Sequence, residues 1–370
     1  MISRTLAQTI KQRNHPKKAV VVMGPRQAGK STLLKYMLPE ALWLDGDEPD
    51  DREFLTNPTS TLLLNRLGNQ SIVVIDEAQR IRNIGVTLKL ITDKIPGIQL
   101  YVSGSSSFEL SSNINEPLTG RKWDFNLLPL SFEEMINHHG FTKESRLLPH
   151  RLIYGYYPEV VTHSEAAEQI IKSLTNNYLY KDVLTWERIQ KPDKIERLVQ
   201  ALALQVGQLV SYHELAKNLG IRHETIENYI QILENAFIVF RVPGLAKNLR
   251  NELVKSRKIF FYDNGVMNAV NEQFKPLSIR SDAGMLWENF LISERKKHLN
   301  NHLTGAKMFF WRTKDQSEID YVEELGGEYK AYEFKWNKLA SYRFPKSFIE
   351  AYKPTEYKLI TPQNLVELYP

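Results

Sequence analysis

The chain has 370 residues, a formal net charge of +5 and no cysteine. With 42% hydrophobic and 25% charged residues, it has the composition of ordinary globular domains, and its length favours roughly two or three of them. The absence of cysteine excludes a disulfide framework, a thiolate zinc site, an iron–sulfur cluster and a cysteine nucleophile.

The N-terminal segment, Met1 to Arg13, alternates apolar and basic residues and lacks a continuous apolar stretch. It therefore predicts a short amphipathic helix rather than a signal peptide. No apolar run in the chain approaches the roughly 18 residues of a membrane span, so we expect no membrane contact and a cytoplasmic location.

Residues 18–130 alternate between strand-like and helix-like segments, which is typical of an α/β fold with a parallel sheet. Two of the expected strands are almost wholly apolar, as strands buried on both faces are. The five expected strands are Ala19–Met23, Ala41–Leu44, Ile72–Ile75, Gln99–Val102 and Phe125–Leu128. We expect this first domain to cover residues 1–130.

The strongest motif follows the first strand and precedes a helical stretch. It fits the phosphate-loop pattern G-x-x-x-x-G-K-[ST], whose glycines let backbone N–H groups surround phosphate oxygens. Lys30 is expected to reach the β- and γ-phosphates of ATP, and the Ser31 hydroxyl to bind Mg²⁺. The expected nucleotide-binding residues are Gly24, Pro25, Arg26, Gln27, Ala28, Gly29, Lys30, Ser31 and Thr32.

A second motif, at the end of the strand Ile72–Ile75, consists of two adjacent acids. A carboxylate in this position binds the Mg²⁺ of the nucleotide through water, and Asp76 fits that role. Glu77 is placed to polarise the attacking water, which favours ATP hydrolysis over nucleotide binding alone.

Three further residues are candidates for the same site. Ser103 and Ser105 follow the strand Gln99–Val102 and are expected to contact the γ-phosphate or the water; a serine-rich turn is the alternative. Arg121 is expected to stabilise transition-state charge in the site of a neighbouring subunit, which implies self-association into a ring or dimer. A solvated surface arginine is the alternative for Arg121.

These motifs resemble those of AAA-type (AAA+) ATPases that carry a C-terminal DUF4143 domain. The resemblance extends over nearly the whole chain. It continues through Gly155–Pro158, Tyr180–Val183, Tyr262–Gly265, Gly284–Asn289 and Phe310–Arg312. It implies an AAA+ ATPase core, a winged-helix element and a C-terminal α/β domain of the PD-(D/E)xK nuclease type.

The middle of the chain is predicted to be helical. Residues 131–190 form the expected helical lid, and residues 191–245 the expected winged helix-turn-helix module. In that module Ser211 and Glu214 predict a capping box, Gly220 a helix end, and His223–Glu234 a second helix. The second helix carries several acids, which phosphates would repel, so a packing module is the alternative to a DNA reader.

A basic stretch follows the helix-turn-helix and contains one acid. We expect it to contact DNA phosphates, with a solvated charged loop as the alternative. Its basic residues are Arg241, Lys247, Arg250, Lys255, Arg257 and Lys258.

The last expected domain, residues 246–370, contains carboxylates in the order of the nuclease pattern. Glu333 and Lys335 lie two apart on an expected strand and share a face, and a hairpin would bring Asp320 near them. With Glu288 from the preceding helix, they are candidates for a second Mg²⁺ or Mn²⁺ site. We expect this domain to recognise DNA rather than cut it, because such folds often lose cleavage.

The sequence as a whole predicts an ATP-hydrolysing AAA+ protein that couples turnover to DNA in repair, recombination or defence. Two other functions are kept open. One is a nucleotide-controlled DNA-binding or regulatory protein, and the other is an ATP-dependent, metal-dependent DNA nuclease.

Overall fold

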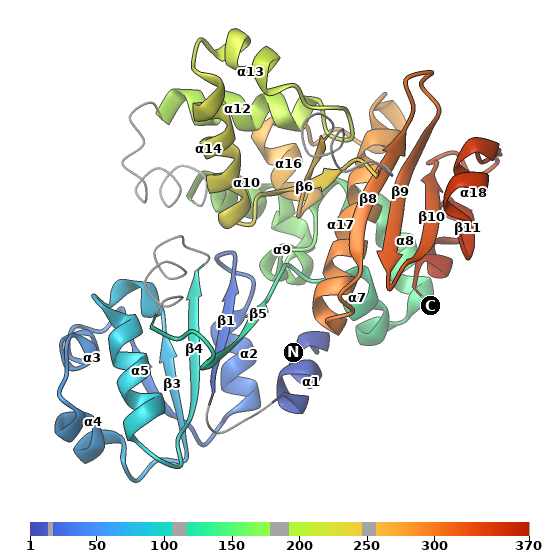
Figure 1. The fold of residues 1–370 in the computed structure, drawn as a ribbon. Coiled ribbons are helices and arrows are strands. Elements are labelled where there is room, and N and C mark those ends of the chain that lie inside the picture. The colour runs from blue at the N-terminus through green and yellow to red at the C-terminus, as the bar shows by residue number, and fades with distance from the viewer. Residues whose placement is uncertain (14–17, 106–116, 178–191, 246–256, 370) are drawn as a thin grey trace.

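The computed structural model describes residues 1–13, 18–105, 117–177, 192–245 and 257–369. Figure 1 shows three units in chain order: an α/β unit at the bottom, a mainly helical unit at the top, and a C-terminal unit built on a small sheet. None of the helices in these ranges is long and apolar enough to cross a membrane.

The first unit is a five-stranded sheet with the order β2-β3-β4-β1-β5, in which every neighbouring pair is parallel. This confirms the predicted α/β class with a parallel sheet. The strands are β1 (Ala19–Gly24), β2 (Leu42–Asp45), β3 (Ile72–Asp76), β4 (Gln99–Ser105) and β5 (Lys122–Asn126). The helices are α1 (Thr5–Gln12), α2 (Lys30–Met37), α3 (Pro49–Leu55), α4 (Ser60–Leu67) and α5 (Ile84–Lys94).

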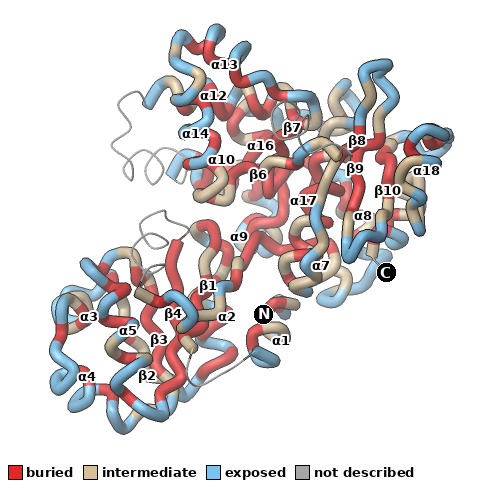
Figure 2. Tube along the Cα trace, in the orientation of Figure 1, coloured by how far each residue is buried: buried red, intermediate tan, exposed pale blue. Residues whose placement is uncertain are grey.

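Apolar cores cover both faces of this sheet. In β1, Ala19 and Val21 belong to one core, whereas Val20 and Val22 belong to the other. Successive side chains point to opposite faces of a strand, which explains why β1 is apolar throughout. Figure 2 shows the resulting run of buried residues along β1, β3 and β4.

The predicted N-terminal helix is present as α1, with Leu6 and Ile10 fully buried. The last predicted strand was placed wrongly, because β5 covers Lys122–Asn126 rather than Phe125–Leu128. As an edge strand beside β1 it tolerates polar residues, so the apolar run was a poor guide to its position.

The second unit contains the helices predicted after residue 131 and a two-stranded antiparallel hairpin. Its helices are α7 (Phe132–His139), α8 (Phe141–Tyr154), α9 (Pro158–Thr162), α10 (Ala167–Thr175), α12 (Pro192–Leu204), α13 (Tyr212–Leu219), α14 (His223–Asn235) and α16 (Asn264–Val270). Its strands are β6 (Val239–Pro243) and β7 (Arg257–Phe261).

The two helices of the predicted helix-turn-helix are α13 and α14, and Gly220 ends α13 with a left-handed φ of 63°. Of the expected capping box, only the half in which Ser211 Oγ accepts from the Glu214 backbone N–H (3.3 Å) is formed between these two residues. The expected domain boundary at 245/246 falls between the paired strands β6 and β7.

The C-terminal unit places α17 (Ala283–His302) against a four-stranded sheet with the order β11-β10-β9-β8. Strands β8 (Lys307–Arg312), β9 (Glu318–Leu325) and β10 (Glu328–Phe334) run antiparallel. After α18 (Lys346–Tyr352), β11 (Glu356–Ile360) pairs parallel with β10. One apolar core runs from Leu128 to Leu368, so the second and third units share their interior.

Candidate functional site

The phosphate loop joins β1 to α2, as the sequence predicts. Gln27 and Gly29 have left-handed φ values of 58° and 93°, which turn the backbone of the loop inward. A Cβ atom at Gly24 would lie 2.1 Å from the Leu127 carbonyl oxygen, so only glycine fits where the loop begins.

Lys30 begins α2 and is folded over the loop. Its Nζ donates to the backbone carbonyls of Gly24 and Pro25, both at 2.9 Å, and the residue is 5% exposed. Burial lowers the pKa of Lys30 to about 8, although the nearby carboxylates of Glu77 and Asp76 oppose this shift. Neutral carbonyls alone hold the ammonium group, and phosphate oxygens are stronger acceptors that can replace them.

Asp76 and Glu77 lie where β3 ends, and Ser103 lies on the neighbouring strand β4. Ser103 Oγ donates to an oxygen of Asp76, and the Glu77 backbone N–H donates to Asp76 Oδ1 at 3.1 Å. Glu77 has a left-handed φ of 47°, and its carboxylate accepts from the side chain of Gln79. Ser105 is buried further along β4, opposite Gly24.

A pocket of about 510 Å³ lies beside the phosphate loop and Glu77. Its lining residues are Arg26, Gln27, Gly29, Lys30, Ser31, Thr32, Asp47, Glu77, Arg80, Pro158 and Glu159. The Ser31 hydroxyl at the start of α2 and the Asp76 carboxylate at the end of β3 are oxygen donors of the kind that Mg²⁺ prefers, so these residues fit a nucleotide-bound Mg²⁺. Pro158 and Glu159 come from α9, so the second unit closes one side of the pocket.

Arg4, which the sequence analysis does not single out, connects the phosphate loop to the second unit. Arg4 is 6% exposed, and its guanidinium donates to Ala28 O (2.8 Å), Leu128 O (2.6 Å) and Glu134 Oε1 (3.0 Å). Glu134 also completes a capping box with Ser131 at the start of α7. An isolated arginine in an amphipathic helix carries no sequence signal for such a role.

Arg121 lies far from the phosphate loop of its own chain. The Ala19 backbone N–H donates to Arg121 O (2.8 Å), which places it where β1 starts, whereas the phosphate loop follows the end of β1. Its guanidinium is 40% exposed and pairs with Asp93 at 2.7 Å.

The predicted DNA-binding stretch has to be corrected at one residue. Lys258 is 1% exposed and forms ion pairs with Glu288 (3.0 Å) and Glu318 (2.7 Å), so it is not available to phosphates. Arg241 is partly exposed and pairs with Glu234, and the Arg257 guanidinium lies 4.3 Å from the ring centroid of Tyr212. Lys247, Arg250 and Lys255 lie outside the described residues.

The C-terminal carboxylates do come together, as the hairpin of β9 and β10 predicts. The Asp320 backbone N–H donates to Glu333 Oε2 (3.4 Å), Asp320 Oδ2 accepts from the Phe334 N–H (2.9 Å), and Lys335 Nζ donates to Glu333 Oε1 (2.6 Å). Burial, followed by the charge of Asp320, raises the pKa of Glu333 to about 7 and that of Glu288 to about 8.

A second cation beside these carboxylates is Lys258, which lies on β7. Burial disfavours its charged form, but Glu288, Asp320 and Glu318 outweigh that effect and raise its pKa. Gly207 packs over the cluster, since a Cβ there would lie 2.7 Å from Glu288 Oε2. Lys258 and Lys335 already form ion pairs with acids of this cluster, and among the described residues these acids do not meet as a group of metal ligands, so the expected second Mg²⁺ or Mn²⁺ is not supported.

Several of the later sequence motifs contact one another. Asp263 accepts from the Tyr156 N–H (2.7 Å), and a Cβ at Gly155 would lie 1.9 Å from Asp263 Oδ1. The Asn289 amide donates to Asn264 Oδ1 (2.8 Å) and accepts from the Phe261 N–H (2.8 Å). These buried polar contacts hold α8, α16 and α17 together, which is a structural role.

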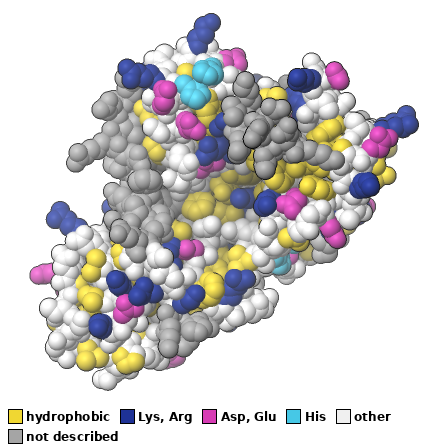
Figure 3. Space-filling model, viewed as in Figure 1, with side chains coloured by type: hydrophobic (Ala, Val, Ile, Leu, Met, Phe, Trp, Pro, Cys, Tyr) yellow, Lys and Arg dark blue, Asp and Glu magenta, His cyan; other side chains and the backbone are white. Residues whose placement is uncertain are grey.

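A pocket of about 680 Å³ lies between the units and is lined by residues of β5, β6, α17 and β8. Arg241, Lys296 and Lys307 are its basic residues. Figure 3 shows a hollow between the α/β unit below and the other units above, with hydrophobic and basic side chains beside it.

Comparisons with known proteins divide the chain into three parts. Residues 16–136 match a family described as "AAA domain", residues 145–277 match a domain of unknown function, DUF8612, and residues 283–368 match a domain of unknown function, DUF4143.

Relatives of similar organisation occur in bacteria and archaea. An uncharacterized protein of Mycobacterium tuberculosis is 26% identical over 339 residues, which is 90% of this chain and 73% of that protein. An uncharacterized protein of Methanocaldococcus jannaschii is 22% identical over 332 residues, covering 83% of this chain and 72% of that protein.

Among solved structures, a Walker-type ATPase of Pyrococcus abyssi is 16% identical with a TM-score of 0.49, covering 73% of this chain and 96% of that chain. The DNA clamp loader delta protein of Bacillus subtilis is 12% identical with a TM-score of 0.28, covering 62% of this chain and 87% of that chain. The two family matches at the ends of the chain agree with the phosphate loop and with the order of the later motifs. The chain therefore contains an AAA domain with a phosphate loop, followed at its C-terminal end by a DUF4143 domain.

Proposed function

We propose that this chain binds and hydrolyses Mg·ATP and couples turnover to DNA, in repair, recombination or defence. The observation that carries the proposal is that Lys30 and Glu77 line one pocket, with Asp76 beside Glu77 at the end of β3, where the carboxyl ends of the parallel strands β1 and β3 flank β4. Binding of a nucleotide alone does not require Glu77 beside the Mg²⁺-binding carboxylate, whereas activation of water does.

Each residue has a defined task in this proposal. Lys30 leaves the carbonyls of Gly24 and Pro25 and binds phosphate oxygens, while Glu77 orients the water and accepts its proton. Ser31 and Asp76 hold Mg²⁺, which when bound neutralises phosphate charge. Ser103 fixes the Asp76 carboxylate from β4.

Two contacts give the nucleotide site a route to the other units. Glu159 of α9 lines the pocket, and Arg4 binds both the phosphate-loop carbonyl of Ala28 and the side chain of Glu134 on α7. If the phosphate loop shifts on ATP binding, Arg4 transmits that shift to Glu134 at the start of the second unit. Such coupling lets ATP turnover respond to whatever the second and third units bind.

DNA is the polyanion that we propose for those units. Three helices followed by the β6–β7 hairpin form the arrangement expected of a winged helix, and the chain between the two strands carries Lys247, Arg250 and Lys255. We propose that these residues and Arg257 contact phosphates. The C-terminal domain, with the PD-(D/E)xK-type carboxylates, is proposed to serve recognition and not cleavage, because Lys258 already pairs with Glu288 of this set and with Glu318.

The deciding experiment measures ATPase rate against single-stranded, duplex and branched DNAs at several salt concentrations. We expect stimulation that weakens steeply with salt, and loss of stimulation by every DNA in the double variant Arg250→Glu/Lys255→Glu. The matched control reverses Lys89 and Lys94, which lie on α5 of the first unit. If no DNA changes the rate, the coupling to DNA is refuted.

A second candidate function is a nucleotide-controlled binding or regulatory protein. The neutralised carboxylate cluster favours it, since a recognition surface needs no metal. It predicts tight DNA complexes with ATP that are unchanged in a variant unable to hydrolyse it. Strong stimulation of wild-type ATP turnover by DNA supports the coupled ATPase instead.

We also propose that Arg121 acts on the site of a neighbouring subunit. Arg121 lies where β1 starts, away from the phosphate loop of its own chain. It can therefore contact a nucleotide only in a neighbouring subunit. Arg121→Ala should lower turnover with ATP affinity nearly unchanged, and mixing it with Lys30→Ala subunits should restore part of the activity. A fully active monomer would refute this role.

A further inference from the structure

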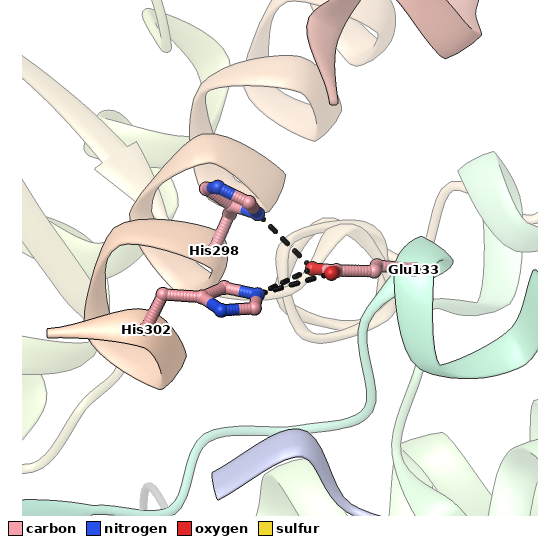
Figure 4. Close-up of side chains that lie close together, drawn as sticks. All are labelled: Glu133, His298 and His302. Atoms are coloured by element: carbon pink, nitrogen blue, oxygen red, sulfur yellow. Dashed lines mark hydrogen bonds and ion pairs between the residues drawn. The ribbon is translucent and has the colours of Figure 1, made fainter. Parts of the chain in front are cut away.

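Two histidines and a glutamate meet where the second and third units touch. Glu133 lies in the first turn of α7, and His298 and His302 lie four residues apart near the end of α17. Residues with that spacing share one face of a helix. Figure 4 shows both imidazole rings directed toward the Glu133 carboxylate. The site is separate from the nucleotide pocket and does not depend on the proposed function.

The geometry of the three side chains is close to that of a metal centre. His298 Nδ1 lies 3.0 Å from Glu133 Oε2, and His302 Nε2 lies 3.0 Å from Glu133 Oε1. All three ligand atoms lie within 4.8 Å of one another. Tetrahedral coordination with bonds of about 2.0–2.1 Å separates ligand atoms by about 3.3 Å, so each histidine–glutamate distance needs to widen by only about 0.3 Å to admit a metal ion.

The site is partly open to solvent. The His302 side chain is 37% exposed, whereas those of His298 and Glu133 are 13% and 23% exposed. An ion can therefore enter from solvent and still be held by two less exposed ligands.

We propose that Glu133, His298 and His302 bind a divalent transition-metal ion of the Zn²⁺ type. Two imidazole nitrogens and one carboxylate oxygen form a ligand set that Zn²⁺ accepts, with a fourth position left for water. Mg²⁺ is disfavoured there because it prefers oxygen ligands.

The ion would fasten α7 to α17. This contact already contains the Phe132 N–H bonded to Glu294 (2.6 Å) and Lys297 Nζ bonded to Leu130 O (3.0 Å). Glu133 is also adjacent to Glu134, which Arg4 connects to the phosphate loop. Metal occupancy would thus fix the C-terminal unit to the segment that Arg4 connects to the phosphate loop.

The test is a titration of chelator-treated, tag-free full-length chain with Zn²⁺ and, separately, Co²⁺. We expect one high-affinity Zn²⁺ per chain, visible absorption of bound Co²⁺, and a rise in the thermal midpoint with Zn²⁺. His298→Gln, His302→Gln and Glu133→Gln should each weaken Zn²⁺ binding by at least about tenfold. Because His302 is exposed, His302→Gln should keep the metal-free thermal midpoint of the wild type.

The chain offers a competing histidine pair as a control. His213 and His223 stack with ring centroids 4.5 Å apart, and His213→Gln should leave Zn²⁺ affinity unchanged. His163→Gln controls for an exposed histidine elsewhere. Binding that survives in all three ligand variants, binding lost in His213→Gln, or the absence of stoichiometric binding would each overturn the proposal.

Discussion

The phosphate loop and the C-terminal carboxylate cluster each place a buried lysine near carboxylates, yet of these two lysines Lys30 lines a pocket and Lys258 is paired with acids. Lys30 is held by neutral carbonyls, beside a pocket of about 510 Å³ that Glu77 also lines. Lys258 is bonded directly to Glu288 and Glu318. The first lysine can exchange its partners for phosphate, whereas the second is neutralised within the protein. Residue type alone does not separate a ligand site from a structural ion cluster.

The largest effect is expected at the open pocket. Glu77→Gln keeps the shape of the side chain but removes the proton acceptor, so ATP hydrolysis should fall by about 10²–10⁴-fold while Mg·ATP still binds. Steady-state turnover and binding of a fluorescent ATP analogue measure the two properties. Glu53→Gln, on the exposed side of α3, is the control. Wild-type turnover in Glu77→Gln would show that this residue is not the base.

Lys258→Met tests whether the C-terminal cluster depends on its internal cation. The change leaves buried carboxylates uncompensated and should lower the free energy of unfolding by about 3–5 kcal/mol. Lys335→Met is the control, because its side chain is 42% exposed and its loss should cost no more than about 1 kcal/mol. Urea denaturation at neutral pH measures both. Equal losses would abolish the distinction between the two lysines.

The pH dependence of stability should also originate in this cluster. Glu333 has a pKa of about 7 in the folded chain, against 4.5 ordinarily, because of burial and then the charge of Asp320. The folded state therefore holds a proton that the unfolded chain has released. This contribution to stability is complete below pH 4.5 and is lost as the pH rises through about 7.

Glu333→Gln removes that titration. The unfolding free energy should then fall less steeply between pH 5 and 8. The change in slope corresponds to up to about one proton fewer released on unfolding. Denaturant titrations at several pH values provide the measurement, with the exposed Glu328→Gln as control. An identical slope in wild type and Glu333→Gln would show that the pKa of Glu333 is not raised.

A smaller effect of pH is expected at the phosphate loop. Burial places the pKa of Lys30 at about 8, and bound phosphates favour its charged form. ATP affinity should therefore fall by up to about tenfold for each pH unit above 8. Lys30→Arg stays protonated, so its ATP affinity, although different at neutral pH, should lack this decline. Isothermal titration across pH 7–9 tests the difference.

The smallest effect is expected for Asp320→Asn, a substitution that would abolish DNA cleavage if the C-terminal domain were an active nuclease. Purified protein should leave DNA intact with Mg²⁺ or Mn²⁺, and Asp320→Asn should change neither cleavage nor ATPase rate. Removing a negative charge there should tighten DNA binding slightly, if it alters it at all. Metal-dependent cleavage that disappears in Asp320→Asn would contradict this prediction. It would show that the C-terminal carboxylate cluster binds ligands, as the nucleotide pocket is proposed to do.

Much of the nucleotide site is determined by the sequence itself. A phosphate loop is a local structure, in which the glycines, the lysine and the serine stand within eight consecutive residues between a strand and a helix. The Asp76–Glu77 pair is local too, and the carboxyl ends of parallel strands meet at one edge of a sheet. The β9–β10 hairpin is also local in sequence, so its pairing could be predicted, and that pairing places Asp320 beside Glu333.

Other features were decided only by the tertiary structure. The position of Lys258 depends on pairing between β6 and β7, and on packing of β7 against α17, which brings it to an acid 30 residues away. The Glu133–His298 contact spans 165 residues. Local propensity and spacing do not encode such pairs, because each arises from packing of whole elements. From sequence alone, a lysine that contacts DNA cannot be distinguished from one that pairs with buried acids. The burial of Lys258 in the structure makes that distinction.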